Sequence, residues 1–177
     1  MRWQLAFLLA AIGGSAQAAP LVFFADAPLA GLNDGSWTTH SLTATTPVHS
    51  GTRSISMEPD NYGGIYLVDR SSPHRFADYQ SLTFWVNGGS GNGQQLRIYL
   101  TLRQQDRNNP YSNAISVATA TVNSLVSGGA IAANTWRQVT LNFDTTTTLT
   151  HGAFDGLIIM DDSGTNQSAV YIDDIQF

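Results

Sequence analysis

The sequence predicts an all-β fold, an antiparallel β-sandwich of the jelly-roll type. No long stretch has helical periodicity, short runs of alternating apolar and polar residues recur, and the segments between them are rich in Gly, Pro, Asn and Asp. About ten short strands at this spacing are typical of a sandwich or jelly roll. Residues 103–114 and the Thr tract at 145–148 are expected to be exposed loops. We expect strands at 21–25, 36–44, 53–57, 64–69, 81–87, 95–103, 115–122, 136–143, 156–161 and 169–177.

The first residues have the pattern of a secretion signal. Arg2 provides a short positive region, residues 5–12 form an apolar run too short to span a bilayer, and residues 16–18 match an A-x-A cleavage site. We therefore expect a signal peptide over residues 1–18, cleaved after Ala18, and a secreted protein that is extracellular or periplasmic. The length of the remainder, residues 19–177, predicts one domain.

The composition excludes several kinds of partner. Thirteen acidic side chains stand against eight basic ones, and the net charge of −5 disfavours nucleic acid and anionic membrane surfaces. The chain has no Cys, so its fold depends on packing or on a bound metal. Few charges and many Thr, Ser, Asn and Gly residues suit a surface that binds neutral polar ligands through hydrogen bonds. We expect a monomer.

Two neighbouring strands, 81–87 and 95–103, are joined by a Gly-rich segment, which predicts a hairpin. Alternation gives each strand an apolar face for the core and an opposite face that carries Trp85, Arg97 and Tyr99. An aromatic platform beside Arg and hydroxyl groups suits a sugar, whose apolar face stacks on a ring. The alternative is a cross-strand aromatic pair that stabilises the hairpin and is covered by a loop.

The last expected strand contains two adjacent carboxylates, Asp173 and Asp174. Asp is disfavoured in strands, and Asp173 falls on the face that also carries Tyr171, Ile175 and Phe177. A carboxylate on this mostly apolar face is costly to bury unpaired. A bound cation is one way to offset that cost.

Five motifs follow one another along the chain. They are PVHSGTRSIS at 47–56, YGGIYL at 62–67, SLTFWV at 81–86, NTWRQV at 134–139 and YIDDI at 171–175. In these motifs and their order, the chain resembles carbohydrate-binding modules with the galactose-binding-like β-jelly-roll fold, of the glucan-binding type. The resemblance extends over the whole of residues 19–177 and implies the fold, whereas function has to be argued from the site.

The resemblance implies a structural Ca²⁺ that joins the first and last strands. The matching ligands are Asp26, the main-chain carbonyl of Arg53, and Asp173, and oxygen donors of this kind are what Ca²⁺ takes. The chain departs from many relatives at Ala25, where they have a second acidic residue. The alternative is that Asp26 caps a turn and that Asp173 accepts hydrogen bonds from a loop.

The resemblance also implies a sugar site on the concave face of one sheet. Aromatic rings would stack on the sugar, and Arg97 and Asp161 would form hydrogen bonds with it. Trp136, in contrast, matches a position where the Trp packs over an end of the sandwich. The expected ligand-binding residues are Trp37, Tyr62 and Asp161 by resemblance, and Trp85, Arg97 and Tyr99 by alternation.

These observations favour a non-catalytic protein that binds a polysaccharide. Glu58 is the only Glu, and the adjacent carboxylates at 161–162 and 173–174 point to opposite faces of their strands, so neither pair provides the facing carboxyl groups of a glycosidase. The four His have no metal-ligand spacing. One alternative is a small polysaccharide lyase that uses Tyr99 with Arg97 and Arg103. The other is a surface or matrix protein that binds a protein partner through the same face.

Overall fold

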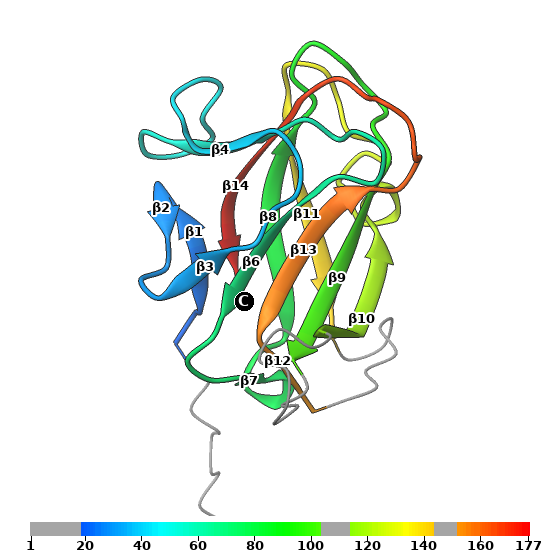
Figure 1. The fold of residues 1–177 in the computed structure, drawn as a ribbon. Coiled ribbons are helices and arrows are strands. Elements are labelled where there is room, and N and C mark those ends of the chain that lie inside the picture. The colour runs from blue at the N-terminus through cyan, green and yellow to red at the C-terminus, as the bar shows by residue number, and fades with distance from the viewer. Residues whose placement is uncertain (1–18, 104–113, 144–151) are drawn as a thin grey trace, which may run out of the picture.

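The computed structural model describes residues 19–103, 114–143 and 152–177. The expected signal peptide, most of the expected loop at 103–114 and the Thr tract at 145–148 lie outside these residues. Two antiparallel sheets pack face to face across one core, and a small third sheet closes one end (Figure 1). The predicted fold class, an antiparallel β-sandwich of the jelly-roll type, is confirmed. The described part of the chain contains no helix that is long and apolar enough to cross a membrane.

The seven-stranded sheet is built around the last strand of the chain. Its main strand order is β11 (Trp136–Asn142), β8 (Ser81–Asn87), β14 (Val170–Gln176), β1 (Val22–Ala25) and β2 (Ala27–Pro28). In addition, β5 (Ser54–Met57) pairs with β14, and β4 (His40–Ala44) pairs with β5. The first and last strands are therefore neighbours, as the resemblance implied.

The five-stranded sheet forms the other layer. Its strand order is β10 (Ala114–Thr121), β9 (Leu96–Arg103), β13 (Gly156–Asp161), β6 (Gly64–Asp69) and β3 (Leu32–Asp34). The third sheet pairs β12 (Ala153–Phe154) with β7 (His74–Arg75), and the short 3-10 helices are η1 (Phe76–Asp78) and η2 (Val122–Ser124). Figure 1 shows β6, β13, β9 and β10 in front of β14, β8 and β11.

Alternating residues of both sheets fill the core. In β9, Leu96, Ile98 and Leu100 are fully buried, whereas Arg97 and Tyr99 are half-buried on the opposite side of the strand. Burial of apolar surface of this kind is the dominant favourable contribution to folding. The period-two pattern of β9 therefore places one face in the core and leaves the other on the outside of the five-stranded sheet.

All ten predicted strands are present, and four short ones, β2, β3, β7 and β12, were not predicted. The expected strand at 36–44 begins later, at His40. The missed strands have two or three residues each, too few to carry a period-two pattern.

The predicted hairpin of β8 and β9 is wrong, because the two strands belong to different sheets. The Gly-rich segment between them crosses the end of the sandwich and bonds to another loop. Gly88 N–H donates to the Ala132 carbonyl (2.9 Å) and Gly93 N–H to the Ile131 carbonyl (2.8 Å). Alternation specifies which face of a strand is buried but not which strand lies beside it.

Candidate functional site

Two large aromatic side chains are exposed at one end of the five-stranded sheet. Trp37 lies between β3 and β4 and is 48% exposed, and Tyr62 lies in the turn before β6 and is 55% exposed. The indole Nε1 of Trp37 donates a hydrogen bond of 2.8 Å to the Tyr62 carbonyl, and its backbone N–H donates one of 3.0 Å to the Gly64 carbonyl. The Trp37 ring is therefore held by the backbone of the turn before β6 although it faces solvent.

The turn that carries Tyr62 has an unusual backbone. Asn61 and Tyr62 both have positive φ, 46° and 64°, and Gly63 N–H closes the turn on the Asp60 carbonyl (2.6 Å). Asn adopts this conformation readily, but it is strained for Tyr, and such strain persists only where the surroundings enforce it. The ring of Tyr62 also packs against Gly164, where a Cβ atom would come within 2.5 Å of it.

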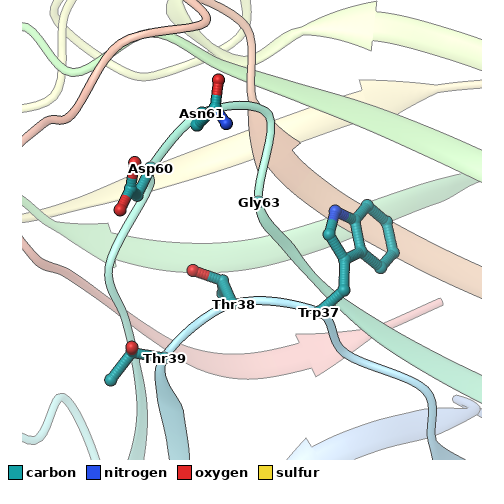
Figure 2. Close-up of a pocket in the computed structure, with 6 residues that line it drawn as sticks. All are labelled: Trp37, Thr38, Thr39, Asp60, Asn61 and Gly63. Carbon is teal, nitrogen blue, oxygen red and sulfur yellow. The ribbon is translucent and has the colours of Figure 1, made fainter.

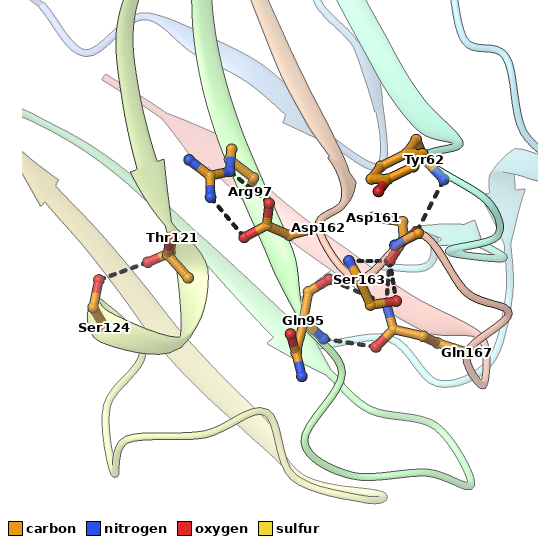
Figure 3. Close-up of polar contacts among 10 residues, drawn as sticks. Tyr62, Gln95, Arg97, Thr121, Ser124, Asp161, Asp162, Ser163 and Gln167 are labelled. Atoms are coloured by element: carbon orange, nitrogen blue, oxygen red, sulfur yellow. Dashed lines mark hydrogen bonds and ion pairs between the residues drawn. The ribbon is translucent and has the colours of Figure 1, made fainter.

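Asp161, at the end of β13, enforces this turn. Its carboxylate is fully buried and accepts a hydrogen bond of 2.9 Å from the Tyr62 N–H. It accepts four more, from Ser163 N–H, Ser163 Oγ, Gly164 N–H and Gln167 Nε2 (Figure 3). Burial by itself raises the pKa of Asp161, but the hydrogen bonds from Tyr62, Ser163 and Gly164 outweigh it and bring the pKa below its ordinary value of 3.8.

A polar pocket of about 370 Å³ is lined by Trp37 and by the neighbours of Tyr62 in the turn before β6. Figure 2 shows that it lies between the segment that leads into β4 and the turn before β6. Within the described residues, neither the Asp60 carboxylate nor the Asn61 amide has a hydrogen-bond partner, so both remain available to a ligand. The lining residues are Trp37, Thr38, Thr39, Asp60, Asn61 and Gly63.

The outer face of the five-stranded sheet continues from this end. Tyr66 of β6, Ile158 of β13 and Tyr99 of β9 lie opposite one another in register, and Gly64, Met160 and Arg97 form the next row toward Trp37. We call the half-buried side chains of these rows the sheet face; they are Tyr66, Tyr99, Ile158, Met160 and Arg97. The sheet face thus combines two phenol rings with aliphatic groups.

Two cations of β9 beside the sheet face, Arg97 and Arg103, are already paired. Arg97 forms two hydrogen bonds with Asp162, Nε to Oδ1 at 2.7 Å and a terminal nitrogen to Oδ2 at 2.9 Å (Figure 3). Arg103, further along β9, pairs with the buried carboxylate of Asp155 at 2.8 Å. A two-point contact of this kind fixes the guanidinium plane and leaves its remaining N–H groups to donate elsewhere.

The structure brings together four of the six predicted ligand-binding residues at the surface. Trp37, Tyr62, Arg97 and Tyr99 lie at one end or on the outer face of the five-stranded sheet. Asp161 lies beneath them, and all of its contacts are internal. The sequence interpretation missed Ile158 and Met160, because the run at 156–161 is apolar on both faces and has no polar alternation to mark the outer one.

The prediction that Trp85 shares a face with Arg97 and Tyr99 is wrong, because Trp85 lies on the seven-stranded sheet. It belongs to β8, and the imidazole of His49 stacks on it with ring centroids 3.9 Å apart and planes inclined by 16°. Trp136 of β11 meets the same imidazole edge-on at 5.6 Å. Trp85 is covered by a loop, as in the alternative interpretation, but it forms no pair with Tyr99.

The predicted metal ligands meet at one turn. Asp26 Oδ1 accepts a hydrogen bond from Arg53 N–H (2.8 Å) and another from Thr52, while Asp173 Oδ2 accepts one from His49 N–H (2.9 Å). In the described residues no group of three or more His, Cys, Asp or Glu could hold a metal ion. The Arg53 group that contacts Asp26 is its N–H and not its carbonyl. Asp26 Oδ2 has no hydrogen bond within the described residues, so one hard oxygen of the predicted set remains free at this turn.

Comparison with characterised sequences finds one relative. The chain is 36% identical over 148 residues to an endoglucanase of Dictyostelium discoideum, and the match covers 80% of this chain and 19% of that protein. The chain therefore spans about a fifth of the length of the relative that it matches. No family model matches the chain.

Solved structures show the fold. The chain is similar to a family 11 carbohydrate-binding module from Clostridium thermocellum in complex with a β-1,3-1,4-mixed-linked tetrasaccharide, with a TM-score of 0.60, 8% identity, and 89% of this chain and 94% of that chain covered. It is also similar to a family 29 carbohydrate-binding module in complex with mannohexaose, with a TM-score of 0.56, 17% identity, and 91% and 92% covered. The chain has the β-sandwich jelly-roll fold of carbohydrate-binding modules.

Proposed function

We propose that this protein binds a neutral polysaccharide, without cleaving it, through Trp37, Tyr62 and the sheet face. The observation that carries the proposal is the exposed pair Trp37 and Tyr62. The Trp37 indole is fixed by its 2.8 Å hydrogen bond to the Tyr62 carbonyl. Tyr62 is fixed by Asp161 through its backbone N–H and by the packing of its ring on Gly164. Side chains that are held in place before binding lose little conformational entropy on binding. An exposed aromatic ring offers its face to the C–H groups of a pyranose, and the fixed pair is therefore suited to stacking.

Polar groups beside the rings support the same function. The Asp60 carboxylate and the Asn61 amide can accept and donate hydrogen bonds to sugar hydroxyl groups. Ligand sites of this kind combine apolar surface with a few placed polar groups. The two solved structures described above were determined with oligosaccharides, and the relative is an endoglucanase, so both comparisons point to glycans.

The charges favour a neutral glycan over a uronate. Arg97 is engaged by Asp162, and the unpaired carboxylate of Asp60 would repel an acidic polymer. A uronate lyase needs a free cation to neutralise the carboxylate of its substrate. The lyase alternative relied on Tyr99 with Arg97 and Arg103, and Arg103 is engaged by Asp155. It is therefore the weaker one.

Binding and cleavage can be separated in one set of measurements. The purified protein would be tested on mixed-linkage β-glucan, glucomannan, polygalacturonate and alginate by affinity electrophoresis and calorimetry. Each mixture would also be assayed for reducing ends and for the ultraviolet absorbance of unsaturated products. We expect retardation by a neutral polymer and no product. Turnover that is lost in Tyr99→Phe would establish the lyase, and binding to none of the polymers would reject the proposed function.

We also propose that the protein is exported and acts as a monomer. The apolar run at 5–12 and the cleavage pattern before Ala19 support export. The N-terminal sequence of the protein recovered from outside the cytoplasm should begin at Ala19. A protein that keeps Met1 and stays in the cytoplasm would contradict this, and light scattering of the purified protein would give its oligomeric state.

A further inference from the structure

Both ring nitrogens of His40 are hydrogen-bonded to oxygen. His40 is the first residue of β4, and its ring is 20% exposed. Nδ1 lies 2.8 Å from the main-chain carbonyl of Thr38, and Nε2 lies 2.8 Å from Oδ2 of Asp34.

These two partners define the charge of the ring. A carbonyl oxygen and an ionised carboxylate can only accept hydrogen bonds, so each ring nitrogen must donate. A neutral imidazole carries one N–H and one lone pair, whereas the imidazolium carries two N–H groups. The observed contacts are therefore both satisfied only in the charged form.

The ring of His40 closes the segment that carries Trp37. Asp34 ends β3 in the five-stranded sheet, and His40 begins β4, which pairs with β5 in the seven-stranded sheet. Trp37 lies midway between them. The contact of His40 with Asp34 therefore joins the two ends of the segment 34–40. Inside the segment, Asp34 also accepts a hydrogen bond of 3.0 Å from Ser36 N–H.

We propose that the His40 imidazolium holds the Trp37 segment in its binding conformation, and that loss of this proton as pH rises weakens glycan binding. The part that concerns binding rests on the proposed function. Deprotonation removes one donor and leaves a ring lone pair facing an oxygen acceptor. One end of the segment 34–40 is then released, and the Trp37 ring loses its fixed position beside Tyr62.

The surroundings of the ring set the direction of the effect. Among the described residues, Asp34 is the one charged group in contact with the ring. β5 and β2, which pack against β4, carry no titratable side chain. Glu58, after β5, contacts the segment through its backbone N–H and carbonyl. Burial lowers the pKa of His40, but the hydrogen bonds to Thr38 and Asp34 outweigh it and raise the pKa above its ordinary value of 6.5.

The sign of the pH dependence follows from this direction. A His with a raised pKa in the folded state stabilises that state fully below its unfolded pKa, and the stabilisation is lost as pH rises through the folded pKa. We therefore expect the segment to be held fully at pH values below 6.5. It should be released as pH rises above 6.5 and through the pKa of the folded protein.

The first experiment needs no glycan. Nitrogen-15 NMR of the imidazole rings reports protonation of His40, and the indole N–H signal of Trp37 reports the position of its ring. We expect His40 to remain charged above pH 6.5 and the Trp37 signal to shift with the same midpoint. Asp34→Asn should move that midpoint to lower pH, because it removes the charge that favours the imidazolium. A neutral His40 at pH 6, or a Trp37 signal that does not follow His40, would overturn the proposal.

The second experiment measures binding of a neutral β-glucan oligosaccharide across the same pH range. Wild-type Kd should rise roughly threefold to tenfold as His40 loses its proton, and His40→Gln, which does not titrate, should give a flat profile. His74→Gln is the matched control, since His74 also has one Asp partner, Asp69 at 3.1 Å, but lies in β7 of the small third sheet. The control should keep the wild-type profile.

The outcomes separate the two proposals. A wild-type profile that is flat, or an equal rise of Kd in His40→Gln, would overturn the pH dependence while glycan binding stands. Absence of binding at every pH would reject the proposed function and, with it, the proposal that His40 regulates binding. The NMR titration would still decide whether His40 holds the Trp37 segment.

Discussion

The fully buried carboxylate of Asp161 accepts a hydrogen bond of 2.9 Å from the backbone N–H of Tyr62, a residue 99 positions earlier in the chain. Tyr62 has a φ of 64° and an exposed ring, so its local conformation has little support of its own. Asp161 thus acts through the backbone of the turn. In this arrangement a buried charge at the end of β13 positions an aromatic ring on the surface.

Replacing Asp161 with Asn should destabilise the protein by about 2–4 kcal/mol, because one amide oxygen cannot replace a carboxylate that accepts hydrogen bonds from several buried donors. Urea denaturation at pH 7 would measure the change in the free energy of unfolding. Asp162→Asn is the matched control, since it removes a partly exposed ion pair and should cost less than about 1 kcal/mol. Equal losses in the two variants would contradict the role given to Asp161.

The difference between wild type and Asp161→Asn should depend on pH. The pKa of Asp161 is lowered in the folded protein, so its stabilising contribution is present above the ordinary value of 3.8 and is lost as pH falls through the folded pKa. The two proteins should therefore approach the same stability in acid. Unfolding free energies measured at several values between pH 7 and pH 2 would test this, and a constant difference over the whole range would refute it.

Gly164→Ala should weaken glycan binding strongly. Gly164 has a φ of 69°, and an added Cβ would come within 2.5 Å of the Tyr62 ring, so the ring must move. Gly93→Ala is a close control, because Gly93 has a φ of 71° and nothing lies within 4 Å of the added atom. Both variants should lose roughly 1 kcal/mol of stability to backbone strain, but only Gly164→Ala should lose affinity. If Gly164→Ala and Gly93→Ala bind the glycan with equal affinity, Tyr62 does not belong to the binding site.

The sequence was sufficient to predict the strands and the faces of most of them. In β9 the alternation of Leu96, Ile98 and Leu100 with Arg97 and Tyr99 identifies the buried face directly. It could not identify the neighbours of β8 and β9, because strand pairing depends on contacts between residues far apart in sequence. The expected hairpin, and with it the position of Trp85, failed for this reason.

The site was predictable only in part, because much of it depends on backbone geometry. Trp37 and Tyr62 could be proposed from the resemblance to carbohydrate-binding modules. The hydrogen bond of the Trp37 indole to the Tyr62 carbonyl and the positive φ of Tyr62 have no signal in the composition of either segment. Asp161 was expected to contact the ligand, and its burial beneath the turn could not be inferred from its position at a strand end.

Calcium binding near Asp26 and Asp173 stays a prediction. Ca²⁺ that binds the folded form alone should raise the melting temperature, EDTA should lower it, and Asp173→Ala should abolish the difference between the two conditions. Asp69→Asn serves as a control, because it also changes a buried carboxylate but leaves this turn intact. If EDTA leaves melting unchanged and equilibrium dialysis detects no bound Ca²⁺, the ion does not join the first and last strands.

Trp37→Ala and Tyr62→Ala should weaken glycan binding several-fold or more with little change in melting temperature, since stacking of an exposed ring contributes on the order of 1 kcal/mol. Trp85→Ala should do the opposite. It removes the ring on which His49 stacks at 3.9 Å, and it should cost about 1–3 kcal/mol of stability while leaving affinity unchanged. Calorimetric binding and thermal melting of the three variants give both quantities. Loss of affinity in Trp85→Ala with Trp37→Ala unaffected would move the binding surface to the seven-stranded sheet, and the proposed use of the five-stranded sheet would have to be abandoned.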